Sequence, residues 1–178
     1  MPKLSLGCGN EPQPKEKGWI NLDINMQPGV DVVHNLEVYP YPFKDNTFDY
    51  ILAEFIIEHL NDFSKVLKEL HRILKPEGVV EISVPYDISY STWSNYQHKR
   101  GFNLKTFLPF AKNTEHKSGQ SYGVAWFSKM EQKLWFPKGL HIFSWLFDII
   151  FNRMQKVYEE TCLRTLIPSY SIKVRLTK

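Results

Sequence analysis

Short apolar segments alternate with glycine, proline and acidic residues from the N-terminus to Pro85, and this alternation constrains the fold more than any other feature. Five segments have the length and composition of β-strands. Between the fourth and the fifth, apolar residues recur at a spacing of three and four, which predicts an amphipathic helix with Asn61 or Asp62 as its N-cap and Lys75 followed by Pro76-Glu77-Gly78 as its end. The predicted strands are Lys3–Leu6, Trp19–Asp23, Val30–His34, Phe48–Ala53 and Val79–Val84.

The rest of the chain is less regular and rich in aromatic side chains. Its patterns predict a short helix at Asn103–Ala111 and a longer one at Leu140–Lys156. Two further segments, Tyr158–Leu166 and Ser171–Leu176, are predicted to form an antiparallel hairpin around Pro168.

These elements predict one α/β domain over residues 1–178. Strand, helix and strand joined by short loops form a right-handed βαβ unit, so we expect a Rossmann-like, mostly parallel sheet with helices on its faces. A C-terminal antiparallel hairpin would lie at one edge. Residues 1–85 would form the ligand-binding half, residues 86–156 an aromatic cap and substrate region inserted after the fifth strand, and residues 157–178 the hairpin.

Composition excludes several classes of protein. Hydrophobic residues make up 43% and charged residues 23%, as in globular domains, so most of the chain is not disordered. No uncharged apolar run approaches the ~20 residues of a membrane span. The net charge of +3 comes from 22 basic and 19 acidic residues in mixed order, which is not the footprint of a nucleic-acid-binding protein. Two cysteines without a CxxC pair favour a cytoplasmic location.

Two strand ends carry residues that indicate a ligand. The segment from Leu4 ends in Gly7-Cys8-Gly9, and glycines permit a tight turn on which a ligand can lie against the backbone. The next strand ends in Asp23, whose carboxylate can accept hydrogen bonds from both hydroxyls of a ribose. Both ends lie at the carboxyl edge of a parallel sheet, where such folds bind ligands. The pair therefore indicates a ligand that contains a nucleoside.

With these motifs, the chain resembles a class I S-adenosylmethionine-dependent methyltransferase of the small type 11 branch. Four segments in the family's order carry the resemblance: LSLGCGN at Leu4–Asn10, INLDI at Ile20–Ile24, YPYPFKDNTFDYILAEFIIEHL at Tyr39–Leu60 and VLKELHRILKPEGVVEISVP at Val66–Pro85. The resemblance implies transfer of a methyl group from S-adenosylmethionine to a small-molecule acceptor. A sugar or a lipid-linked glycan is the favoured acceptor, because similar small methyltransferases often act on surface glycans or lipids.

The resemblance also implies a cofactor site at the tips of the strands. The glycine turn would lie against the methionine part, with Cys8 acting through its backbone rather than as a nucleophile. Asp23 would accept the ribose hydroxyls, and the tip of the fourth strand would lie near the sulfonium. The cofactor-binding residues expected on this basis are Gly7, Cys8, Gly9, Asp23, Ile24, Asn35, Leu36 and Ala53.

The chain departs from the family pattern in three places. The interval between Gly9 and Asp23 is too short for a full helix beside a strand, so a loop at Glu11–Lys17 replaces the family's first helix. Asn35 stands where many relatives have an acid for the adenine amino group, and its amide oxygen can still accept that bond. Phe55 stands where relatives often have histidine.

Candidate catalytic residues are His98 and Glu54. His98 begins a His-x-Arg-x-Phe segment that resembles a recurring family segment, and it is the preferred base for an acceptor hydroxyl or amine. A structural hydrogen bond is the alternative role for His98. The pair Glu58-His59 is expected to anchor the loop after the fourth strand. No metal site is expected, because the histidines at 34, 59 and 71 lack metal-ligand spacing.

Several alternatives stay open. The aromatic second half could pack as cap or core, form a homodimer face or rest on a membrane surface. A non-catalytic relative that binds the cofactor or a protein partner without turnover is the main rival function. A nucleotide-binding oxidoreductase is disfavoured because the first motif is not G-x-G-x-x-G opening a helix. A nucleic-acid partner is not expected, since no basic stripe is visible.

Overall fold

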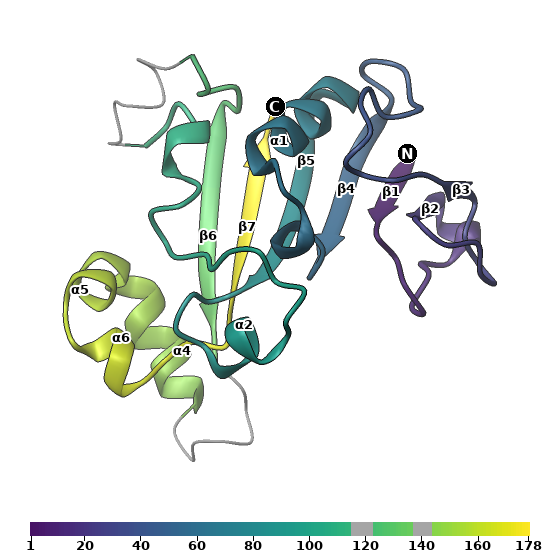
Figure 1. Cartoon of the computed structure of the whole chain (residues 1–178). Helices are drawn as coiled ribbons and strands as arrows, with labels where there is room; N and C mark the ends of the chain where they lie inside the picture. Colours follow the sequence, from purple (N-terminus) through teal and green to yellow (C-terminus); the bar gives the residue numbers. More distant parts are fainter. Residues whose placement is uncertain (115–122, 137–143) are drawn as a thin grey trace.

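A computed structural model describes residues 1–114, 123–136 and 144–178. Its centre is a seven-stranded sheet in the order β3-β2-β1-β4-β5-β7-β6 (Figure 1). The strands from β3 to β5 pair in parallel, and β7 runs antiparallel to both of its neighbours. The expected fold class, a mostly parallel sheet with an antiparallel pair at its C-terminal edge, is confirmed. The strands are β1 (Lys3–Leu6), β2 (Trp19–Asp23), β3 (Val32–Val33), β4 (Phe48–Glu54), β5 (Leu74–Pro85), β6 (Lys129–Trp135) and β7 (Ser171–Thr177).

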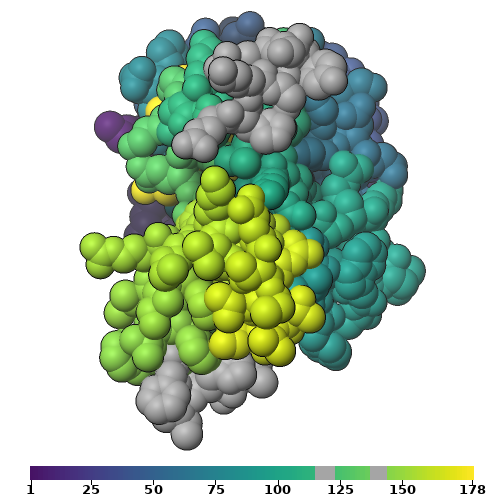
Figure 2. Space-filling view, turned by 90° about the vertical axis from the view of Figure 1, so that its left-hand side faces the viewer, coloured from purple at the N-terminus to yellow at the C-terminus, as the bar shows by residue number. Residues whose placement is uncertain are grey.

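The helices fall into two groups. Helix α1 (Phe63–Ile73) lies in front of β4 and β5, and α2 (Tyr90–Ser94) lies near the carboxyl ends of the parallel strands (Figure 1). Three others gather beside β6, where they form a continuous yellow-green surface in Figure 2. These are α4 (Ser144–Arg153), α5 (Gln155–Glu160) and α6 (Leu163–Leu166), and the single-turn 3-10 helices are η1 (Lys15–Lys17), η2 (Ile57–His59) and η3 (Leu108–Phe110).

Helix α1 begins at the cap that its sequence predicts. The Asp62 side chain accepts a hydrogen bond from the Lys65 backbone N–H at 3.0 Å, which satisfies one of the free donors of the first turn. The chain leaves the helix directly into β5, and Glu77 turns it with a positive φ of 62°. The buried side chains of α1 lie on one face, which packs against the sheet: Phe63, Val66, Leu67, Leu70 and Ile73.

One face of the sheet is apolar across most of its width. Leu4, Ile51, Val80 and Leu176 stand in register on β1, β4, β5 and β7, and each is fully buried. Their neighbours along the strands point to the other face, and all but Leu52 are polar: Ser5, Leu52, Glu81 and Arg175. This alternation fixes the register, because a slip of one residue would turn every apolar side chain out of the core.

The predicted position of the first hairpin strand is wrong. Tyr158–Leu166 forms α5 and α6, and the strand that pairs with β7 is β6, from Lys129 to Trp135. Tyr158 is fully buried and donates its hydroxyl to the Ile167 carbonyl at 2.9 Å, which holds the helical segment closed. Residues 129–135 therefore belong to the sheet and not to a cap, and residues 157–166 do not belong to a hairpin.

Half of the aromatic residues that the structure describes after residue 85 are buried in the core. Phe136 and Phe151 pack with Tyr158 at the base of α4, and Phe102 packs with Phe63 of α1. The helix expected at Leu140–Lys156 is α4 over Ser144–Arg153, and residues 140–143 lie outside the described residues. Of the short helix expected at Asn103–Ala111, only η3 forms. Across the described ranges, no helix has both the length and the apolar character needed to cross a membrane.

Candidate active site

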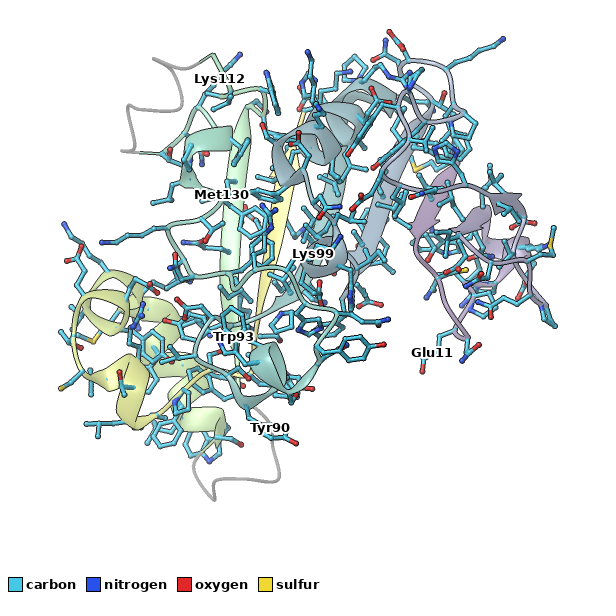
Figure 3. All side chains as sticks on the ribbon, in the orientation of Figure 1. Glu11, Tyr90, Trp93, Lys99, Lys112 and Met130 are labelled. Carbon is cyan, nitrogen blue, oxygen red and sulfur yellow. The ribbon has the colours of Figure 1, made fainter. Side chains whose placement is uncertain are left out.

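A cavity of about 690 Å³ lies at the carboxyl ends of β1 and β2. Five of its lining residues are among those expected from the sequence: Gly7, Asp23, Ile24, Asn35 and Leu36. The opposite wall comes from η2 and from the segment after α2, and its residues include Ile56, His59, Leu60, Tyr96, Gln97 and Lys99. None of these residues is expected in the site from the sequence. Figure 3 labels Lys99 on that wall segment and Glu11 in the loop that follows β1.

Asp23 closes the glycine turn onto the tip of β2. Its Oδ2 accepts the backbone N–H of Gly9 at 2.9 Å, and its Oδ1 accepts that of Asn25 at 3.0 Å. The residue is only 9% exposed, yet it lines the cavity. Because each carboxylate oxygen has two acceptor positions, both oxygens can still accept a hydroxyl of a ligand.

The turn at Gly7 requires glycine at its first position. Gly7 has a positive φ of 64°, and a Cβ there would lie 2.5 Å from Cγ1 of Ile56. Gly9 also has a positive φ, of 52°, but a Cβ there would meet nothing within 4 Å. Gly7 therefore lets the wall residue Ile56 approach the backbone at the floor of the cavity.

Polar groups at the far end of the cavity are already engaged. The Asn35 side-chain oxygen accepts the Glu37 backbone N–H at 2.9 Å, so its remaining lone pair is the one left for a ligand. The Glu37 carboxylate accepts two hydrogen bonds from Asn61 and lies 3.5 Å from the Lys99 ammonium. Hydrogen bonds from Asn61 hold the pKa of Glu37 below its usual value. This network ties the cavity wall after α2 to the loop after β3.

A second cavity of about 310 Å³ lies on the other side of the glycine turn. Cys8 and Glu54 line it, together with Phe55 and residues of the loop that replaces the first helix. Phe55 has a positive φ of 50°, which is rare for a bulky side chain and marks a strained backbone at the tip of β4. Ala53 is fully buried in the sheet and lines neither cavity.

Behind the wall of the larger cavity, His98 lies against Glu58 and His59. The His98 Nδ1 donates to the Thr92 carbonyl at 2.8 Å, and its Nε2 lies 4.0 Å from Oε1 of Glu58. His59 lines the cavity, whereas His98 does not. Burial raises the pKa of Glu58 to about 7, and burial with the neighbouring His98 lowers the pKa of His59. The proposed base is thus separated from the cavity by the His59 ring.

Comparison with known proteins locates the family signal in the first half of the chain. Residues 4–82 match the family model described as a methyltransferase domain. This match covers less than half of the chain, so the likeness to the family concerns this segment alone. In fold alone, the chain is similar to an S-adenosylmethionine-dependent methyltransferase from Archaeoglobus fulgidus, which superposes over 99% of this chain and 85% of that protein, with a TM-score of 0.64 and 16% identity. One from Mesorhizobium loti superposes over 99% and 90%, with a TM-score of 0.60 and 13% identity.

Curated relatives match over a shorter range. A demethylmenaquinone methyltransferase from Lysinibacillus sphaericus is 33% identical over 95 residues, which are 53% of this chain and 39% of that protein. One from Geobacillus stearothermophilus is 33% identical over 81 residues, 46% of this chain and 33% of that protein. The chain thus matches well under half the length of these relatives.

Proposed function

We propose that the chain is an S-adenosylmethionine-dependent methyltransferase acting on a small molecule. The proposal rests chiefly on the position of Asp23. This residue lies beside Gly7 at the carboxyl ends of β2 and β1, and its carboxylate has free acceptor positions at a cavity of about 690 Å³. The methyltransferase family match over residues 4–82 covers both of these residues.

The residues present fit this cofactor. Asp23 would bind the ribose hydroxyls, Ile24 and Leu36 would flank the adenine, and the backbone at Gly7 would face the methionine part. When bound, the cofactor supplies an electrophilic methyl group on its sulfonium. The wall residues would hold an acceptor atom in line with that methyl group and exclude water, which is the main contribution an enzyme makes to such a displacement.

For the acceptor, we favour a flat, quinone-type ring over a sugar or glycan. The names of the curated relatives specify demethylmenaquinone and not a carbohydrate. In this chain, Ile56 and Leu60 supply apolar wall, and Tyr96 lies at the mouth with its side chain 93% exposed, free to stack on a ring. Residues after 85 supply part of this wall and lie beyond the range 4–82 of the family match, so we expect them to contribute to the choice of acceptor.

The rival function, cofactor binding without turnover, is favoured by one observation. His98 faces Glu58 and Thr92 rather than the cavity, so the base preferred from the sequence does not reach an acceptor in this arrangement. An acceptor that ionises readily, such as a quinol, needs less help from a base than a sugar hydroxyl does.

Two titrations and one turnover assay test the proposal. Calorimetric titration with S-adenosylhomocysteine should show micromolar binding, and NAD should not bind. Transfer of labelled methyl groups should then be measured with a reduced naphthoquinone and, separately, with sugar acceptors. Binding without transfer to any acceptor would support the non-catalytic rival, and binding of neither ligand would overturn the cofactor assignment.

We also propose a location and a contact surface for this activity. Both cysteines are free, which suits the reducing cytoplasm. Helices α4 to α6 expose Trp145, Ile149, Met154 and Leu166, so the partner surface expected from the sequence, for a second copy or a lipid surface, would lie there. Sedimentation with and without anionic vesicles distinguishes a second copy from a lipid surface. A chain that sediments as a monomer and does not bind vesicles would exclude both partners.

A further inference from the structure

A group of three side chains, in which Glu58 is buried and the two histidines are half-buried, lies beside the larger cavity. Glu58 and His59 come from η2, and His98 comes from the segment after α2. Each offers one ligand atom, and these atoms all lie within 4.8 Å of one another. The Glu58 side chain is 1% exposed and the His98 side chain 7%.

The Glu58 carboxylate lacks the partners that a buried acid needs. Neither oxygen has a hydrogen-bond partner among the residues that the structure describes. Burying an ionised carboxylate is costly unless it is paired, coordinates a metal or becomes neutral. Because η2 holds Glu58 facing inward, the folded chain bears the desolvation free energy of this carboxylate unless a cation or a proton compensates for it.

The histidines are oriented as metal ligands usually are. His98 Nδ1 must donate its proton to the Thr92 carbonyl at 2.8 Å, because a carbonyl only accepts, and in the neutral ring this leaves a lone pair on Nε2. That Nε2 is the atom 4.0 Å from Glu58 Oε1. The His59 ring meets the His98 ring edge-on at 4.7 Å between centroids. Ligating histidines commonly make a bond like that of His98 to Thr92 from the ring nitrogen that does not bind the metal.

We propose that Glu58, His59 and His98 bind a divalent transition-metal cation, with zinc as the type case. Two imidazoles and one carboxylate form a ligand set that suits zinc and leaves a fourth position open. His59 also lines the cavity, so the metal would lie beside the cavity wall, and its open position would take water.

Binding requires a small closure of the three side chains. Ligand atoms about 2.1 Å from a common ion lie roughly 3.4 Å apart in a tetrahedral site. The distance of 4.0 Å from Glu58 Oε1 to His98 Nε2 would therefore shorten by less than ~1 Å, which rotation of the carboxylate can supply. The inference does not depend on methyl transfer, because it concerns these three side chains alone.

The test is metal binding by the full chain without added cofactor or acceptor. The chain is stripped with a chelator and titrated with zinc against a chromophoric competitor. We expect one equivalent to bind and to raise the melting temperature. Glu58→Gln and His98→Asn should each weaken binding by more than ~100-fold, beyond the effect of losing a residue that only orients a ligand. His71→Gln, on α1 outside the group, should bind as the unmodified chain does.

Cobalt(II) loading reports the ligands without any variant. An absorption spectrum of nitrogen and oxygen coordination, without a thiolate charge-transfer band, is expected. Failure of the unmodified chain to bind zinc would overturn the proposal and leave Glu58 as a neutral, buried acid. Zinc that stays bound in Glu58→Gln and His98→Asn, or a thiolate band with cobalt, would also overturn it by locating the metal elsewhere. Binding of S-adenosylhomocysteine is measured separately, in the presence of chelator. It tests the proposed cofactor site independently of these metal-binding results.

Discussion

Replacing Asp23 with asparagine tests the cofactor site at its most constrained residue. Asparagine keeps the size of the side chain but loses its charge and one acceptor oxygen. The two Asp23 oxygens already accept backbone N–H groups of Gly9 and Asn25 at 2.9 and 3.0 Å, so the single remaining oxygen cannot serve both N–H groups and both ribose hydroxyls. At least one ribose hydroxyl then loses a charged acceptor.

A hydrogen bond to a charged group contributes about 1.5–3 kcal/mol. At ~1.4 kcal/mol per factor of ten, Asp23→Asn should weaken S-adenosylhomocysteine binding roughly 10- to 150-fold in calorimetry. Asp31→Asn is the matched control: Asp31 accepts the Asn21 backbone N–H at 2.9 Å and lines neither cavity, so affinity should not change. Thermal unfolding shows whether each variant folds. Affinity within about threefold of the unmodified chain in a folded Asp23→Asn variant would refute the assignment.

Three further perturbations test the surrounding structure. Gly7→Ala should lower the free energy of unfolding more than Gly9→Ala, because only the first places a Cβ 2.5 Å from Ile56; urea titrations that give equal losses would contradict this. Glu37→Gln should destabilise the chain at pH 7 and less in acid. The pKa of Glu37 is lowered in the folded state, so Glu37 contributes to the free energy of unfolding above pH 4.5, and this contribution is lost as pH falls through the folded pKa. A loss of stability in Glu37→Gln that does not depend on pH would count against this. Leu70→Ala should cost about 2–5 kcal/mol in chemical denaturation, because Leu70 is fully buried, and a loss below ~1 kcal/mol would show that α1 does not pack as described.

The parts of the fold that local patterns specify were predictable. Strands β1 and β2 have the predicted bounds and helix α1 begins after the predicted cap, because apolar periodicity, capping residues and glycines act over a few residues. Strand β6 was missed although its buried Met130 and Leu134 alternate with the exposed Glu131 and Lys133. Its partner, β7, follows only after α4, α5 and α6, so no local sequence pattern predicts that these two strands pair.

The same division applies to the site. Gly7 and Asp23 were found because both end a strand at the same edge of the sheet, where position along the chain determines position in space. The wall residues Tyr96 and Lys99 were missed because the irregular segment after α2 reaches the cavity through tertiary contacts. His98 was identified from the sequence only as a single residue. It lies close to Glu58 in space, but Glu58 precedes α1 and His98 follows β5, so the spacing between histidines could not predict that these side chains meet.

The shortened loop after β1 also bears on which nucleoside ligand the cavity can hold. A helix at this place would present its N-terminus to the ligand, and a pyrophosphate depends on that positive end. Here the loop forms only the three-residue η1, and the turn is held instead by the bond from Gly9 to Asp23. S-adenosylmethionine carries no phosphate and needs chiefly the ribose acceptor and the glycine floor, both of which the chain keeps. The loss of the helix therefore disfavours a dinucleotide more strongly than it disfavours the proposed cofactor, and the paired titrations with S-adenosylhomocysteine and NAD measure this difference directly.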